Sequence, residues 1–253
     1  MIPVRLSIVT YNIWLTERWP ARAPALERFL TLFNPDLLCL QELQPATQAF
    51  LDEILKGHAR VHDPLPGWTN EGNIYWKKTM FDLVKHGAEE VGHLEPERRM
   101  FWARLKLKET GQAIFVSTAH LTTPRRKEEA ETGQSPRVGQ LKRISAELTR
   151  LVAEGEPAFF MGDMNDPRHP QRILKEIGFR SCFAALGMQS PPTFQCYPTA
   201  NIEPDEATIT EAIDLIAANR HAQALAASVP QVFHGDIAPS DHWPVHAVYE
   251  LHA

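Results

Sequence analysis

The segment that decides the fold is Ala158-Phe159-Phe160-Met161-Gly162-Asp163-Met164-Asn165. It begins directly after Glu156-Pro157, where the proline breaks the preceding chain. A short, wholly apolar run of this kind is typical of a buried strand, and here it ends in Gly162-Asp163. Strand ends hold side chains rigidly at one rim of a sheet, where catalytic sites are commonly built. The segment therefore predicts a sheet with a carboxylate fixed at its rim.

Three other predicted strands also end in a polar residue. They are Leu6–Tyr11 followed by Asn12, Asp36–Gln41 followed by Glu42, and Gln112–Ala119 followed by His120. Acids and amides gathered at one rim repel one another unless a cation or protons offset the charge. Oxygen ligands of this kind favour magnesium, or manganese, over zinc. The strand ends therefore indicate a divalent-metal site.

Helical periodicity lies between the strands. Apolar residues recur with helical spacing over residues 21–33, 46–56 and 136–151. Ser135 is expected to cap the last of these helices, with Pro136 in its first turn. Further strands are predicted at Asn73–Trp76, Met80–Lys85, Met100–Leu107, Ile213–Ile216 and Val245–Leu251. This irregular alternation fits one mixed sheet, or two packed sheets with helices outside.

The composition is that of an ordinary globular protein, with 43% hydrophobic and 23% charged residues. The sequence contains no repeat, low-complexity tract or long linker, which favours a single domain over residues 1–253. Three cysteines without metal-like spacing favour a reducing compartment. No membrane span or signal-peptide pattern is seen, so a cytoplasmic location is expected. A net charge of −5 excludes a polyanion binder held by bulk charge.

Five short motifs follow one another along the chain. They are Thr10-Tyr11-Asn12, Leu40-Gln41-Glu42, Gly162-Asp163-Met164-Asn165, Ile213-Asp214 and Ser240-Asp241-His242-Trp243. In this order the chain resembles the endonuclease/exonuclease/phosphatase superfamily. The Leu-Gln-Glu and Ser-Asp-His-Trp forms are similar to those of tyrosyl-DNA phosphodiesterase 2 and of sphingomyelinase-like members. The resemblance implies a DNase I-like α/β fold, a four-layer α/β/β/α sandwich of two mixed sheets packed face to face with helices outside.

The resemblance also implies a metal site. Glu42 would be the principal ligand of Mg²⁺, or of Mn²⁺, with Asn12 and Asp241 close to the ion. Taken singly, Asn12 is equally compatible with a turn, and Glu42 with a helix-start acid before Pro45. The ordered set of motifs favours the metal site.

Catalytic roles are implied in the same way. His242, oriented and made more basic by Asp214, would contact the phosphate and activate or position the attacking water. Asp163 would hold or deprotonate that water, Asn165 would grip a phosphate oxygen, and His120 would stand beside the leaving group. In-line displacement at phosphorus needs an oriented water and a stabilised leaving oxygen. Taken singly, Asp163 could be a turn residue and His120 a hydrogen-bonded sheet residue.

Two further residues are candidates for substrate contacts. Asn73, in Glu71-Gly72-Asn73, resembles a phosphate-contacting asparagine of some branches of the superfamily, although it also suits a turn at the start of a strand. Arg99, in the pair Arg98-Arg99, could steer an anionic substrate, although charge runs are commonly solvated.

These observations predict a divalent-metal-dependent phosphoesterase, with a phosphodiesterase favoured because two histidines suit leaving-group chemistry. The predicted substrates are a nucleic-acid end, a phospholipid head group or a small phosphorylated metabolite. The alternatives are a phosphomonoesterase, a lipid phosphodiesterase, or a non-catalytic phosphate- or nucleic-acid-binding module on the same scaffold. No protein partner can be inferred from the sequence.

Overall fold

A computed structural model describes residues 3–124, 127–194, 196 and 210–252. In this part of the chain the strands form two six-stranded sheets, which we call sheet A and sheet B. In spatial order, sheet A consists of β11 (Ala222–Ser228), β12 (Val245–Leu251), β1 (Arg5–Asn12), β2 (Leu37–Gln41), β4 (Gly72–Lys77) and β3 (His58–Arg60). Sheet B consists of β5 (Phe81–Glu89), β6 (Met100–Leu107), β7 (Ala113–His120), β8 (Ala158–Asp163), β10 (Asp214–Ala218) and β9 (Arg180–Ser181).

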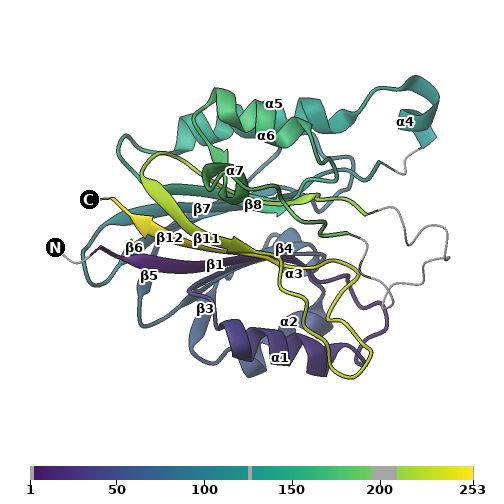
Figure 1. The fold of residues 1–253 in the computed structure, drawn as a ribbon, viewed down its shortest axis with the longest axis horizontal. Helices are drawn as coiled ribbons and strands as arrows, with labels where there is room; N and C mark the ends of the chain where they lie inside the picture. The colour runs from purple at the N-terminus through teal and green to yellow at the C-terminus, as the bar shows by residue number, and fades with distance from the viewer. Residues whose placement is uncertain (1–2, 125–126, 195, 197–209, 253) are drawn as a thin grey trace.

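Helices cover the outer face of each sheet (Figure 1). Those in the described ranges are α1 (Ala23–Phe33), α2 (Pro45–Ile54), α3 (Gly67–Asn70), α4 (Lys127–Thr132), α5 (Pro136–Leu151), α6 (His169–Glu176) and α7 (Cys182–Ala185). The first two lie over sheet A, and α5 and α6 lie over sheet B. The expected α/β/β/α sandwich is therefore confirmed. None of these helices is both long and apolar enough to cross a membrane.

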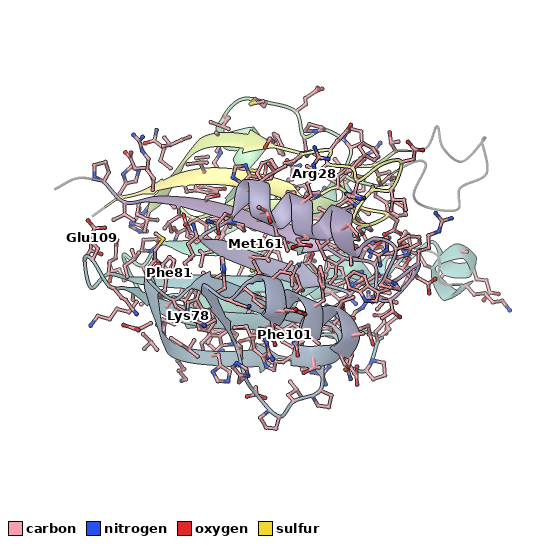
Figure 2. The ribbon with its side chains drawn as sticks, turned by 90° about the horizontal axis from the view of Figure 1, so that it is seen from below. Arg28, Lys78, Phe81, Phe101, Glu109 and Met161 are labelled. Carbon is pink, nitrogen blue, oxygen red and sulfur yellow. The ribbon has the colours of Figure 1, made fainter. Side chains whose placement is uncertain are left out.

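The largest apolar core lies between the two sheets. Phe81, Phe101 and Met161 of sheet B belong to it, together with residues of sheet A such as Ile8 and Tyr249 (Figure 2). Two outer cores lie under the helices, one beneath α1 and α2 and the other beneath α5 and α6. Burial of apolar surface in these three layers supplies the main driving force for the fold.

Two parallel strand pairs bring the predicted site residues to one rim. In sheet A, β1 and β2 are parallel, with Asn12 opposite Gln41. In sheet B, β7 and β8 are parallel, with His120 opposite Asp163. The antiparallel strand β10 places Asp214 opposite Asp163 on the other side. Because the carboxyl ends of parallel strands meet at the same edge, both sheets deliver polar side chains to the same region.

A polar bridge joins the sheets just below this rim. The Gln41 side-chain amide donates to the hydroxyl oxygens of Thr10 and Thr118, over 3.1 and 2.8 Å, and all three residues are buried. Thr118 belongs to sheet B, so the bridge fixes the spacing of the two sheets where the site begins.

The structure extends or corrects several sequence-based expectations. The strand predicted at Met80–Lys85 runs from Phe81 to Glu89. Ser135 does stand at the N-cap of α5, but its side chain makes no capping hydrogen bond. The elements that were not predicted are β3, β9, β11, α3, α4, α6 and α7. Most of these elements are too short to show a period, and β11 is rich in alanine, which has little strand preference.

Candidate active site

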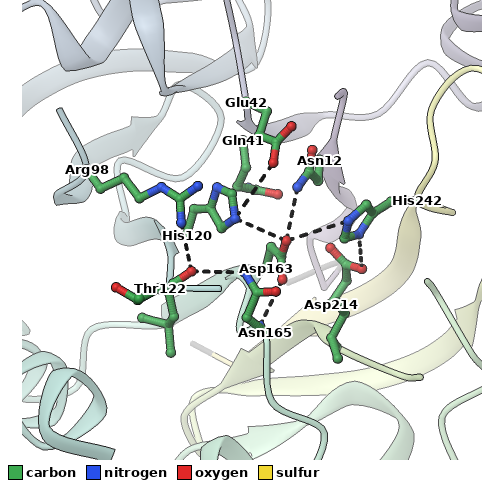
Figure 3. Close-up of polar contacts among 12 residues, drawn as sticks. Asn12, Gln41, Glu42, Arg98, His120, Thr122, Asp163, Asn165, Asp214 and His242 are labelled. Carbon is green, nitrogen blue, oxygen red and sulfur yellow. Dashed lines mark hydrogen bonds and ion pairs between the residues drawn. The ribbon is translucent and has the colours of Figure 1, made fainter. Parts of the chain in front are cut away.

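Asp163 lies at the centre of the site, fully buried at the end of β8 (Figure 3). Its Oδ2 accepts a hydrogen bond of 3.0 Å from the Asn12 amide. The same oxygen lies 3.3 Å from Nε2 of His120 and 3.7 Å from Nε2 of His242. Burial acts to raise the pKa of Asp163, but the two histidines outweigh it and hold the pKa well below its usual range. Asp163 is therefore a carboxylate held between two imidazoles.

His242 is oriented by a second carboxylate. Its Nδ1 lies 2.8 Å from Oδ2 of Asp214, and both side chains are buried. Burial lowers the pKa of His242, but Asp214 and Asp163 raise it well above the ordinary value. The Phe194 ring packs against the imidazole, with 4.7 Å between ring centroids. The predicted pair of Asp214 and His242 is thus in contact, with Nε2 directed at the centre of the site.

His120 has a matching carboxylate partner in Glu71, which lies directly before β4. Its Nδ1 is 2.8 Å from Oε1 of Glu71. Burial and the charge of Arg98 act to lower the pKa of His120, yet Asp163 and Glu71 raise it to about 9. Two carboxylate–histidine pairs therefore flank Asp163 from opposite sides. Glu71 was not predicted, because an acid in a turn before a strand carries no periodic signal of burial.

Asn165 belongs to the same cluster. Its backbone N–H donates to Oδ1 of Asp163 over 2.9 Å, and its side-chain amide donates to the Leu121 carbonyl over 2.9 Å. The residue has a φ of 48°, in the left-handed region that asparagine tolerates better than most residues. The backbone thus turns sharply after Asp163, and Asn165 lies beside the carboxylate rather than beyond it.

The predicted metal residues lie at the end of sheet A. Glu42 has a φ of 55°, and its side chain is 19% exposed, with Oε1 3.9 Å from Nε2 of His120. Burial raises the pKa of Asp241 to about 6, opposed by His242 and reinforced by Glu42. The carboxylates of Glu42 and Asp241 repel each other across a buried rim, beside the amide of Asn12. A hard divalent cation would stabilise this oxygen-rich set.

A second group of ligand atoms is found among the described residues. Atoms of Asp163, Asp214 and His242 lie within 4.8 Å of one another, close enough to hold an ion. Both ring nitrogens of His242 already face carboxylates, however. This arrangement is therefore suited to proton transfer among Asp163, His242 and Asp214. The more exposed Glu42 is better suited to be a metal ligand.

Asn73 lies apart from this cluster. It is fully buried in β4, and its amide donates to the carbonyls of Val61 and Trp68. Its Oδ1 accepts from the backbone N–H groups of Val61 and Ile74. These bonds occupy both donors and the acceptor, so the structure gives Asn73 a role in holding the loop and not the predicted substrate contact.

Arg99 does not point into this cluster, whereas its neighbour Arg98 does. Arg99 donates to the carbonyls of Pro96 and Arg98 and pairs with Glu90 over 3.1 Å. Arg98 instead reaches into the site, where Nη1 donates to the Leu121 carbonyl over 2.8 Å (Figure 3). A run of two arginines does not reveal which one faces inward, so the sequence could not separate them.

A model of the Endonuclease/Exonuclease/phosphatase family matches residues 9–242. Protein angel of Drosophila melanogaster is 29% identical over 161 residues, which are 58% of this chain and 44% of that protein. The chain therefore spans less than half the length of this relative.

Solved structures share the fold at low sequence identity. A family member from Bacteroides thetaiotaomicron has a TM-score of 0.78 and 16% identity, with 100% of both chains covered. D. rerio TDP2 in complex with a single-strand DNA product has a TM-score of 0.76 and 17% identity, covering 97% of this chain and 98% of that one. A mannosyl-6-phosphatase from B. thetaiotaomicron has a TM-score of 0.76 and 17% identity, covering 96% and 99%.

The family match extends over most of the chain, from β1 to the loop that carries His242. The motifs that carry the resemblance converge on one rim of a two-sheet sandwich. The solved structures share that sandwich over nearly their whole length. The chain belongs to the endonuclease/exonuclease/phosphatase family, whose members cleave phosphate esters.

Proposed function

We propose that the protein is a magnesium-dependent phosphodiesterase that cleaves a P–O bond by attack of water. The observation that carries the proposal is the symmetry around Asp163. One histidine lies on each side of this carboxylate, and each histidine is held by its own acid, Asp214 or Glu71. Displacement at phosphorus requires one group to handle the proton of the water and another to handle the leaving oxygen.

The metal in this proposal would be held by Glu42 and Asp241, with Asn12 beside it. The ion would act as a Lewis acid that spreads the charge developing on the phosphate oxygens. Manganese would serve as an alternative, since it accepts the same oxygen ligands. Burial is the main cause of the raised pKa of Asp241, and the charge of Glu42 adds to it; a cation between the two carboxylates would offset both effects, which supports this assignment.

The attacking side of the site is assigned to His242, Asp163 and Asn165. Asp163 is ionised at neutral pH, since its pKa is held low, and it can therefore orient a water or accept its proton. Nε2 of His242 lies 3.7 Å from Oδ2 of Asp163 and Nδ1 is held by Asp214, so Nε2 would face a phosphate bound beside Asp163. The Asn165 side-chain amide donates one hydrogen to the Leu121 carbonyl, and its second hydrogen would be donated to a phosphate oxygen.

The leaving-group side is assigned to His120. With a pKa of about 9, its imidazole is protonated at neutral pH and can donate a proton to the departing oxygen. An alkoxide needs a proton when it leaves from a monoester as well as from a diester, so His120 supports the cleavage of either ester, and the preference for a phosphodiester stays a prediction from the sequence. The substrate would be a nucleic-acid end, a phospholipid head group or a small phosphorylated metabolite. A cytoplasmic location and a single domain over residues 1–253 stay predictions.

The test is hydrolysis of bis-p-nitrophenyl phosphate with Mg²⁺, with Mn²⁺ and with EDTA. Asp163→Asn and His242→Ala are expected to lower kcat by about 10²- to 10⁴-fold. His86→Ala, which breaks the half-buried pair with Asp63, serves as the matched control and should keep the wild-type rate. Equal rates in all four proteins, or full activity in EDTA, would refute the proposal.

Comparing leaving groups tests the role of His120. p-Nitrophenolate is a stable anion, so its departure needs little help from an acid, whereas an alkyl alkoxide must be protonated as it leaves. His120→Ala should therefore slow an alkyl diester much more than bis-p-nitrophenyl phosphate. The same loss with both esters would show that His120 acts elsewhere. A panel of single-strand DNA ends, sphingomyelin and sugar phosphates then decides the substrate class.

A further inference from the structure

Arg22, the residue before α1, is a fully buried cation. Its guanidinium donates to backbone carbonyls rather than to a carboxylate. The acceptors are Glu17 at 2.6 Å, Trp14 at 2.9 Å, Ile13 at 3.0 Å, Leu15 at 3.5 Å, and Pro239. The rings of Trp14 and Trp19 lie 5.1 and 5.8 Å from the guanidinium carbon. Burial of a charge without such partners would cost several kcal/mol, so this arrangement is built around the arginine.

The acceptors lie in two segments that are far apart in the sequence. Residues 13–17 leave β1 directly after Asn12, and Pro239 directly precedes the segment Ser240-Asp241-His242. Arg22 therefore ties the loop after one metal residue to the loop before another. The Ser240 hydroxyl joins the same two segments by donating to the Asn12 carbonyl over 2.7 Å.

Glu42 is connected to the same loop through its backbone. The N–H of Leu15 donates to the Glu42 carbonyl over 3.0 Å, and the N–H of Ile13 donates to the Gln41 carbonyl over 3.0 Å. All three proposed metal residues are thus adjacent to segments that Arg22 holds. Burial lowers the pKa of Arg22, while Tyr11, Asp241 and Glu42 act to raise it, so the guanidinium is electrostatically coupled to these acids.

We propose that Arg22 is a positioning residue of the metal site, which fixes residues 13–17 and 239–242 so that Asn12, Glu42 and Asp241 share one cation. The inference rests on the proposed function. A rigid support for ligating side chains raises metal affinity, because the loops need not be ordered when the ion binds. The positive charge of Arg22 acts in the opposite direction, since it repels a cation.

These two effects predict opposite results when the charge is removed. If Arg22 acted through its charge alone, Arg22→Met would strengthen metal binding. If it acts by positioning, the same variant weakens binding even though a repelling charge is gone. The positioning role depends on the planar guanidinium group with its five N–H donors. Arg22→Lys keeps the charge but loses this group, so it should also weaken metal binding.

The experiment measures Mn²⁺ affinity without substrate, from the electron paramagnetic resonance signal of the free ion. Arg22→Met and Arg22→Lys are expected to raise Kd by about tenfold or more. Arg104→Met is the matched control, because Arg104 also donates to a carbonyl, that of Leu151, and pairs with Glu156 away from the site. It should lose stability without a change in Kd.

Two results would overturn the positioning role of Arg22, and a third would refute the proposed metal site instead. An unchanged or lower Kd in Arg22→Met overturns the positioning role. If Arg22→Met does not fold, Arg22→Lys decides the question, since it retains charge and most of the volume, and a wild-type Kd in that variant overturns the role. Failure of the wild-type protein to bind Mn²⁺ in a manner that depends on Glu42 would instead refute the proposed metal site.

Discussion

At the scale of single residues, the site is a row of alternating charges. Glu71, His120, Asp163, His242 and Asp214 follow one another, and each contact lies between 2.8 and 3.7 Å. Opposite charges at these distances in a buried site stabilise the ionised forms of both partners. The row thus keeps Asp163 ionised and His120 protonated at the same pH, as their proposed roles of base and acid require.

This row makes the stability of the metal-free protein depend on pH through His120. Its pKa rises from 6.5 to about 9 on folding, so the stabilisation is complete below about pH 6.5 and is lost as the pH rises through about 9. The free energy of unfolding of wild type minus that of His120→Asn should therefore fall by roughly 1 to 3 kcal/mol between pH 6 and pH 9.5. Urea denaturation in EDTA measures this difference.

His58 provides a control of opposite sign. Burial lowers the pKa of this histidine, whose Nε2 is 2.8 Å from the Pro35 carbonyl. Its neutral form is preferred in the folded state, so the wild-type advantage over His58→Asn should grow as the pH rises through about 6.5. A pH trend of the same sign for both histidines would contradict the assigned charges.

The sequence predicted most of this row but not all of it. His120, Asp163, Asp214 and His242 stand at strand ends or in recognisable motifs, and the structure brings them together. Glu71 could not be found in this way, because its importance comes from the pairing of β4 with β2, which carries it to the rim. Local sequence does not encode which strand becomes a neighbour.

At the scale of elements, the site depends on how closely β7 and β8 approach. Gly162 has a φ of 139°, and a Cβ placed there would lie 2.0 Å from the Ala119 carbonyl oxygen. No side chain fits that space, and the conformation itself is one that glycine alone adopts readily. The glycine before Asp163 is therefore required by the strand pair, which agrees with its place in the motif.

Gly162→Ala should consequently destabilise the fold by about 3 kcal/mol or more, since backbone clash and backbone strain act together. Gly155→Ala is the matched control, because Gly155 also has a positive φ, 76°, but has no atom within 4 Å of its Cβ position. It should cost about 1 kcal/mol from strain alone. Urea unfolding compares the two variants, and equal losses would show that the close approach to Ala119 is unimportant.

The elements themselves were predictable where they are long or wholly apolar. β6 and β12 have the predicted bounds, and α1 and α5 lie within a few residues of theirs. Elements such as β3 and α7 are held by their neighbours and carry no independent pattern of their own. Pairing order was also out of reach, since it depends on contacts between distant segments.

At the scale of the molecule, sheets A and B each place carboxylates at the shared rim. These like charges repel one another. This repulsion opposes folding of the metal-free protein, and the proposed cation would offset it. Mg²⁺ at about 100 times its Kd should stabilise the protein by about 2.7 kcal/mol, which raises Tm by roughly 5 to 10 °C for a chain of this size. Differential scanning calorimetry in EDTA and in Mg²⁺ measures the shift.

Glu42→Gln should abolish most of that shift, because it removes the proposed principal ligand of the ion. Glu109→Gln, on an exposed turn away from the site, should keep the full shift (Figure 2). If Mg²⁺ stabilises wild type and Glu42→Gln equally, the ion binds elsewhere.

The choice between one mixed sheet and two packed sheets was likewise decided at this scale, by family resemblance and not by periodicity.

The pairing of β1 with β12 has a consequence for the timing of folding. Arg5 lies opposite Glu250, so a strand near the beginning of the chain finds its partner only when a strand near the other end is present. Contacts of such long sequence separation form late and slowly. During synthesis, the edge of β1 that pairs with β12 therefore stays unpaired, which exposes β1 to aggregation. We expect the proposed activity to appear only after Asp241 and His242 have left the ribosome.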